Sequence, residues 1–253
     1  MKHIDLNCDM GELPHAIADG TQEALMPSFT SVNVACGGHA GDAQTMQTTI
    51  QQALRWKLAV GAHPGYPDRA NFGRVELSLS PQAIADSVYR QVRDLGEIAA
   101  RNGVSLAHVK PHGALYNQAV HDRQLARAIA KGVAQWRTDI VLVGLAGSPM
   151  LDVFREAGFA IAAEAFADRR YEPDGTLRSR KHEDALIRDP SDAGRQALSI
   201  AERGLVLASD GSEVLVSAQT ICIHGDTPGA QQIAVAVAQA LHQAGVQLAP
   251  LSP

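Results

Sequence analysis

The sequence predicts a closed barrel of seven parallel strands and outer helices, forming one domain over residues 1–253. Short apolar runs alternate with amphipathic stretches, which is typical of parallel strands joined by crossover helices. Several of these runs carry polar side chains on one face. A closed barrel turns that face inward, where charges can pair, whereas an open sheet would bury it beneath helices. No linker or internal repeat divides the chain.

The predicted strands are short and rich in apolar residues. They comprise residues 4–9, 28–36, 58–63, 105–110, 139–145, 160–166 and 217–224. After the last helix we expect the tail, residues 249–253, to be frayed.

Capping residues locate the helices between the strands. Ser80 and Pro81 are the N-cap and first position of the clearest helix, which ends at Asn102. Asp122 and Pro228 open two others.

A further helix follows Asp42. It places Met46, Ile50 and Leu54 on one stripe, which we expect to face the core.

Composition excludes several classes of protein. The 253 residues carry a net charge of -5, so no general basic excess is available for nucleic acid. No apolar run approaches the roughly 18–20 residues of a membrane span. Asp5 and Asp9 interrupt the N-terminus where a signal peptide would be apolar, which favours a cytoplasmic protein. Three cysteines far apart in sequence are expected to be reduced thiols.

Side chains two residues apart in a strand point the same way, so the polar face can be identified. It comprises Asp5, Asn7, Asp9, Ser31, Asn33, His108, Lys110, Glu164, Cys222 and His224. Many polar residues also follow the C-terminal ends of the strands, and α/β barrels keep their chemistry at that end.

Lys110 is the strongest catalytic candidate, because a lysine inside a barrel must be paired. Asp9 is the leading carboxylate, as a catalytic group or a ligand, and Pro111 stiffens the spacing between Lys110 and His112. Asp5 and Glu12 near the first strand can equally cap a helix or satisfy barrel hydrogen bonds.

Asp9, His39 and His63 end neighbouring strands and form a set that can hold a divalent metal with open positions for water. The alternative is that the histidines bind substrate or act as acid and base. His224 and Asp226 can bind substrate or phosphate at a helix start, or Asp226 can simply cap that helix.

Other features are less specific. Cys8 and Cys36 are expected to lie outward as small apolar residues, whereas Cys222 faces inward and is a weak nucleophile candidate. The charged segment 168–190 is either a solvated excursion or a lid. No phosphate-binding loop motif or glycine-rich dinucleotide motif occurs.

Six segments, in order along nearly the whole chain, resemble successive motifs of the LamB/YcsF family. They are DLNCDMGE (residues 5–12), NVACGGHAGD (33–42), GAHPGYPD (61–68), HVKPHGALYN (108–117), EAFADRRY (164–171) and HGDTPGA (224–230). The resemblance implies a (β/α)7 barrel similar to the glycoside hydrolase and deacetylase fold. It also implies a part of a 5-oxoprolinase that acts with subunits B and C, opening the lactam of 5-oxoproline to glutamate with ATP as co-substrate.

The resulting site predictions combine the motifs with the strand faces. The catalytic candidates are Asp9, Lys110, His112 and Glu164; the substrate-binding candidates are Asn7, Asn33, His39, His63, His224 and Asp226; the metal candidates are Asp9, His39 and His63. Two other functions stay open: a self-sufficient metal-dependent amidohydrolase or carbohydrate deacetylase, and a non-catalytic subunit that presents 5-oxoproline. Association into homo-oligomers is also left open.

Overall fold

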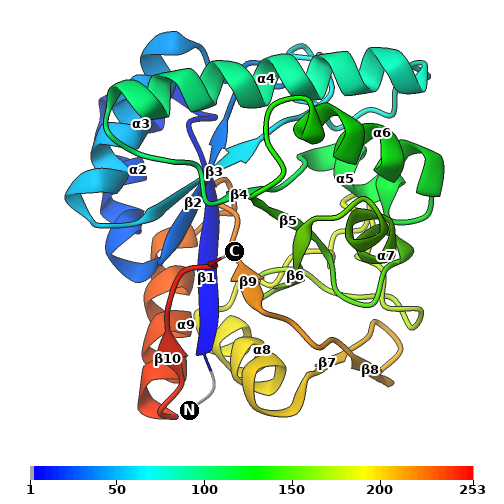
Figure 1. Cartoon of the computed structure of the whole chain (residues 1–253). Helices are drawn as coiled ribbons and strands as arrows, with labels where there is room; N and C mark the ends of the chain where they lie inside the picture. Colours follow the sequence, from blue (N-terminus) through cyan, green and yellow to red (C-terminus); the bar gives the residue numbers. More distant parts are fainter. Residues whose placement is uncertain (1–2, 253) are drawn as a thin grey trace.

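The apolar runs form parallel strands that close on themselves in the computed structural model, which describes residues 3–252. Neighbours pair in the order β1, β2, β3, β4, β5, β6 and β9, and β9 pairs back with β1. Figure 1 shows this ring with the helices outside it. The strands are β1 (His3–Met10), β2 (Ser31–Ala35), β3 (Ala59–His63), β4 (His108–Val109), β5 (Val141–Leu145), β6 (Ala160–Phe166) and β9 (Thr220–Cys222). The predicted fold is confirmed.

Helices cover the outer face of the barrel and bury their apolar stripes against it. In α4, for example, Val88, Val92 and Leu95 are almost fully buried. The helices are α1 (Pro14–Ala18), α2 (Thr21–Leu25), the 3-10 turn η1 (Met26–Ser28), α3 (Ala43–Arg55), α4 (Pro81–Arg101), α5 (Gly113–Ala119), α6 (Arg123–Ala134), α7 (Pro149–Glu156), α8 (Pro190–Arg203) and α9 (Ala230–Gln243).

The predicted caps are present at three helices. The Ser80 hydroxyl accepts from the Ala83 amide, and the Asp122 carboxylate accepts from the first turn of α6. Asp42 forms a capping box with Thr45, so both donors at the start of α3 are satisfied. The last helix begins later than predicted, at Ala230, because Gly229 rather than Pro228 precedes its first turn.

Two details of the sequence prediction are wrong. Leu54 is 41% exposed, because the buried stripe of α3 continues from Ile50 to Ala53, three residues on, rather than four. The second strand begins at Ser31, because Pro27 and its neighbours form the turn η1 instead of extended chain. The other strands are also shorter than the apolar runs that predicted them.

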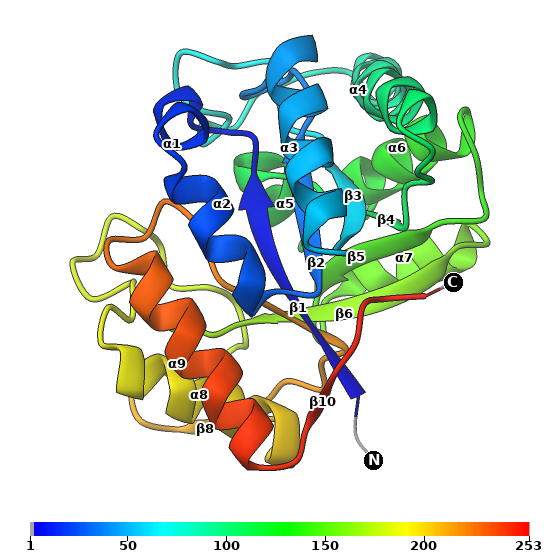
Figure 2. The same ribbon diagram turned by 90° about the vertical axis from the view of Figure 1, so that its left-hand side faces the viewer.

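The C-terminal segment is held against the barrel, so the prediction of a frayed tail is wrong for its described part. Strand β10 (Gln247–Leu248) pairs with the start of β1, and the next amide, of Ala249, donates to the Ile4 carbonyl. Leu251 then packs on a small apolar cluster at Val141, Val143 and Ala162. Figure 2 shows this segment beside the start of β1, away from its arrowhead. Pro253 lies outside the described residues.

A small hairpin, β7 (Leu205–Leu207) and β8 (Glu213–Leu215), was not predicted. Segment 168–190 is anchored at its beginning, where Asp168, Arg169 and Tyr171 are buried and the Tyr171 hydroxyl accepts from the Phe166 amide. Among residues 3–252, the structure contains no helix with the length and apolar character needed to span a membrane.

Candidate active site

Lys110 lies directly after β4 and points into the barrel, where its side chain is only 3% exposed. Its Nζ is 2.9 Å from Asp9 Oδ1, 2.9 Å from Glu164 Oε1 and 3.0 Å from Cys222 Sγ. Asn7 Oδ1 is a fourth partner at 3.3 Å. Side chains from β1, β4, β6 and β9 therefore meet at one ammonium group, as the alternation of strand faces predicts.

Electrostatics keep this group of charges ionised. Burial by itself would lower the pKa of Lys110, but Asp9, Cys222 and Glu164 outweigh it and raise that pKa well above its usual value. Burial would likewise raise the pKa of Asp9, yet His63 and Lys110 hold it well below its usual value. Lys110 is therefore suited to stabilising negative charge rather than to acting as a base, and Asp9 is a carboxylate rather than an acid.

Asparagine and histidine side chains hold Asp9 in place. Asn33, which faces Asp9 across β1 and β2, donates to its Oδ1 at 2.8 Å and to Asn7 Oδ1 at 2.7 Å. His108 Nε2 lies 2.6 Å from Asn33 Oδ1. Burial lowers the pKa of His108 to about 3, so this ring is neutral and fixes the amide orientation of Asn33. Asn7 and Asn33 thus position the charged groups.

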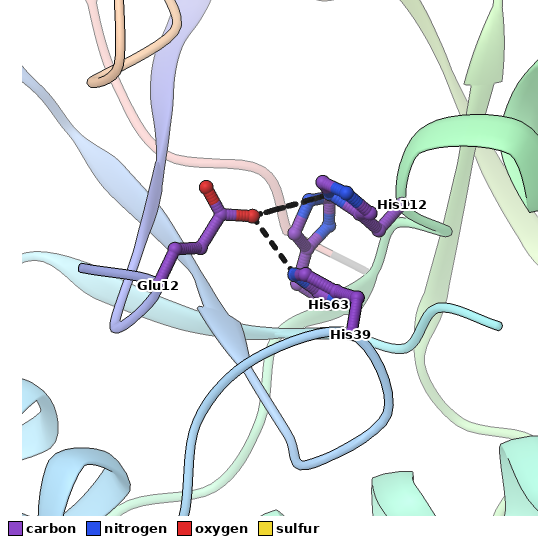
Figure 3. Close-up of side chains that lie close together, drawn as sticks. All are labelled: Glu12, His39, His63 and His112. Atoms are coloured by element: carbon purple, nitrogen blue, oxygen red, sulfur yellow. Dashed lines mark hydrogen bonds and ion pairs between the residues drawn. The ribbon is translucent and has the colours of Figure 1, made fainter. Parts of the chain in front are cut away.

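Glu12 and the histidines after β2, β3 and β4 form a second cluster beside the first, shown in Figure 3. Glu12 Oε1 is 2.8 Å from His39 Nε2, 3.1 Å from His112 Nδ1 and 3.8 Å from His63 Nε2. His112 Nδ1 is also 2.9 Å from His63 Nε2. Asp9 contacts this cluster through His63, at 3.3 Å, because its other oxygen is held by Lys110.

The histidines of the cluster have different proton affinities. Burial lowers the pKa of His39 to about 3 and also lowers that of His112. Burial opposes protonation of His63 as well, but Asp9 outweighs it and raises the pKa of that ring. Glu12 has its pKa lowered despite burial, because it accepts from His112 and His39. The cluster is therefore a buried carboxylate facing mainly neutral imidazoles.

Asp168 was missed by the sequence analysis as a site residue. It is fully buried, accepts from the His224 backbone amide at 3.1 Å and the Thr227 hydroxyl at 2.7 Å, and lies 3.0 Å from His224 Nδ1. Burial would raise the pKa of this carboxyl, but His224 and Thr227 lower it to about 2. The signal was available, since Asp168 continues the inward alternation of Glu164 and Phe166 beyond β6.

Asp226 lies at the mouth of the barrel instead of joining the Lys110 group. It forms ion pairs with Arg74 and Arg180, and it does not cap α9. Together with Asp9 and Glu12 it lines a cavity of about 240 Å³, walled by α1, α2 and the start of α9. This cavity connects the mouth to the buried carboxylates.

The cysteines agree with the predicted faces, because Cys8 and Cys36 are buried in the apolar core. Cys222 contacts Lys110, but burial raises the pKa of its thiol well above the usual value. A neutral thiol is a poor nucleophile, which argues against that role for Cys222.

Fold and site together define a (β/α)7-barrel protein with a buried acid, histidine and lysine site at the C-terminal ends of its strands. The LamB/YcsF family model matches residues 4–253, and the chain belongs to the LamB/YcsF family.

Related proteins extend over the same length. A protein of Chloroflexus aggregans, which bears the name of the A subunit of 5-oxoprolinase, is 50% identical over 97% of this chain and 98% of its own. One of Tolumonas auensis with the same name is 46% identical over 98% of this chain and 99% of its own. The crystal structure of a lactam utilization protein from Thermus thermophilus is 42% identical, covers 99% of this chain and 100% of its own, and has a TM-score of 0.92.

The barrel itself is shared more widely. A family 4 carbohydrate esterase from Streptomyces lividans has a TM-score of 0.51 at 12% identity, over 100% of this chain and 94% of its own. At that identity the likeness concerns the fold alone.

Proposed function

We propose that this chain is the A subunit of an ATP-dependent 5-oxoprolinase, which converts 5-oxo-L-proline to L-glutamate together with subunits B and C. The observation that supports the proposal best is the Chloroflexus aggregans relative, which carries that name and is 50% identical over 97% of the chain. The buried charged site adds a physical reason, because a protein that only presented substrate would not need an ionised lysine and carboxylates inside its barrel.

The chemistry explains the use of ATP. Amide resonance makes the lactam carbon a weak electrophile, and transfer of the terminal phosphoryl group to the lactam oxygen removes that resonance. One water then adds to the ring carbon, and the C–N bond breaks with a proton delivered to nitrogen, leaving an acyl phosphate. A second water releases phosphate, so one ATP and two waters give glutamate, ADP and phosphate.

Each role follows from the local contacts. Lys110, held by Asp9 and Glu164, offers a fixed positive charge to the oxyanion that forms when water adds. His63 and His112, beside that group, are suited to moving protons to and from water and the ring nitrogen. Asn7 and His224 border the same interior and are proposed to contact substrate.

ATP and the partners enter the proposal from the relatives, since the chain carries no phosphate-binding loop motif. We propose that subunits B and C complete the activation step, and that the enzyme works in the cytoplasm, where ATP is available.

The test measures glutamate from 5-oxoproline and ATP with this chain alone, with subunits B and C alone, and with all three. Only the complete mixture is expected to form glutamate, with one ATP consumed per turnover. Equal glutamate from B and C without this chain would exclude the proposed role, and glutamate from this chain without ATP would replace it by an autonomous hydrolase.

In the complete mixture, Lys110→Met is expected to lower kcat at least about 100-fold, the usual size of lost oxyanion stabilisation. Lys131→Met on α6, an exposed position, is the matched control and should keep full activity. Lys110→Arg, which keeps a buried cation beside Asp9, guards against loss of fold, and circular dichroism verifies each variant. A folded Lys110→Met protein with normal kcat contradicts the assignment.

A metal-dependent amidohydrolase or carbohydrate deacetylase is the second candidate, and the Glu12 and histidine cluster favours it. It predicts that this chain alone, with Zn²⁺ and without ATP, releases acetate from N-acetylated sugars. Absence of acetate under those conditions removes this candidate.

A further inference from the structure

Four possible metal-ligand atoms converge beside the Lys110 group: Glu12 Oε1, His39 Nε2, His63 Nε2 and His112 Nδ1. Four of the separations among them are 2.8, 2.9, 3.1 and 3.8 Å. A tetrahedral zinc ion with ligands at about 2.0–2.1 Å would set its ligand atoms about 3.3 Å apart. The cluster is thus already spaced close to the edges of a zinc coordination tetrahedron.

Backbone carbonyls fix which nitrogens of two rings carry protons. His63 Nδ1 lies 2.7 Å from the Lys110 carbonyl, and His112 Nε2 lies 2.9 Å from the Phe72 carbonyl. A carbonyl only accepts, so both of these nitrogens must be donors. In each neutral ring the remaining nitrogen then carries a lone pair, and those two nitrogens face one another at 2.9 Å.

This arrangement needs a cation. Two imidazole lone pairs and the Glu12 carboxylate are all acceptors, and acceptors at these separations repel one another unless a proton or a metal ion lies among them. Metal-binding histidines are commonly oriented in this way, with the second ring nitrogen donating to a carbonyl or carboxylate.

The third ring is held rigidly in the same place. His39 stacks on His112 with ring centroids 3.6 Å apart and planes 4° apart, and it meets His63 edge to face. Its Nδ1 is buried without a hydrogen-bond partner among residues 3–252, so the polar contact of this ring is made by Nε2 alone. In Figure 3 all three rings point toward the Glu12 carboxylate.

We propose that Glu12, His39, His63 and His112 bind one divalent transition-metal ion, with zinc the best match. Three imidazole nitrogens and one carboxylate oxygen suit zinc, cobalt or nickel, whereas magnesium and calcium prefer oxygen ligands. The set differs from the one predicted from sequence, because Glu12 and His112 take part and Asp9 is held by Lys110.

The position connects the site to the cavity. Glu12 lines the cavity together with Asp9, and His63 contacts both Asp9 and the Lys110 carbonyl. A bound ion would supply Lewis acidity next to the Lys110 group. The proposal stands independently of the proposed function, because it concerns metal binding by the isolated chain.

The test uses the purified full chain, stripped with a chelator and titrated with Co²⁺ while its visible absorption is recorded. One equivalent is expected to give the intense bands of a four- or five-coordinate cobalt site, and one equivalent of Zn²⁺ should abolish them. The melting temperature should rise on addition of either metal. A folded chain that shows neither the bands nor the rise holds only a proton at this cluster, and the proposal fails.

Variants locate the site. Glu12→Gln, nearly identical in size, and His39→Gln should each weaken Co²⁺ binding at least about 10-fold, a loss of the size seen when metal-site residues are removed. His121→Gln, at an exposed histidine between α5 and α6, is the matched control and should bind as the wild type does. Unchanged affinity in folded Glu12→Gln and His39→Gln proteins would place the metal elsewhere and overturn the proposal.

Discussion

Asp168 is a fully buried carboxylate surrounded by donors from His224 and Thr227. Its environment favours the charged form although burial opposes it, so the carboxyl binds its proton less readily in the folded chain than in the unfolded one. A carboxylate of this kind contributes stability above its unfolded pKa. Its hydrogen bonds also orient the ring of His224 at the mouth of the barrel.

Asp168→Asn is expected to lower the free energy of unfolding by about 2 kcal/mol at pH 7, because the shift from 3.8 to about 2 favours the folded carboxylate. The difference from wild type should be complete above about pH 4 and vanish as the pH falls toward about 2. Urea unfolding at several pH values measures it. Asp152→Asn, at an exposed position, is the control, with a change within about 0.5 kcal/mol. A difference that persists unchanged down to pH 2 contradicts the explanation.

At the scale of the element, strand β3 has a glycine where its neighbours carry polar side chains. Gly61 pairs with Asn33 of β2 on one side and His108 of β4 on the other. Because Gly61 has no side chain, His108 reaches across the strand to Asn33 Oδ1 at 2.6 Å. The glycine therefore allows the hydrogen bonds that orient Asp9.

Gly61→Ala is expected to destabilise the fold by about 1–3 kcal/mol or more, since the added Cβ would lie 2.1 Å from His108 Nε2. Gly144→Ala in β5 is the matched control. Its Cβ would lie 3.1 Å from the flexible ends of Leu151 and Met150, so it should cost less. Thermal unfolding of both variants measures the difference, and equal stability would contradict the role given to Gly61.

At the scale of the whole molecule, the two ends of the barrel have different tasks. The C-terminal ends of the strands carry the charged site, whereas the opposite end is covered by the C-terminal segment after β10. Closure through the pairing of β1 with β9 is what brings Asn7 and Cys222 to the same ammonium group. Stability and chemistry are thereby separated along the barrel axis.

Leu251→Ser is expected to lower the free energy of unfolding by about 1–2 kcal/mol, because Leu251 covers Val141 and Val143. Glutamate formation in the complete mixture should stay at the wild-type level, since Lys110 lies near the other end. Leu215→Ser, at a side chain that is 79% exposed in β8, is the control with a near-zero effect. A loss of activity at unchanged stability in Leu251→Ser would contradict this separation.

Much of the fold could be predicted from local pattern. Strand alternation predicted that Asp9, Lys110 and Glu164 share one interior, and hydrogen-bonding side chains predicted the caps at Asp42 and Ser80. Both depend on neighbours within a few residues, so the physical cause is present in the sequence itself.

Other features depend on contacts between distant segments, and only the tertiary structure decided them. Whether Asp9 or Glu12 faces His39 is set by which oxygen Lys110 occupies, and the tautomers of His63 and His112 are set by carbonyls from other loops. The sequence by itself determined that a polar, charged interior exists and which strands carry it. Barrel closure decided how those groups pair, because burial makes each charge take the partner that geometry brings nearest.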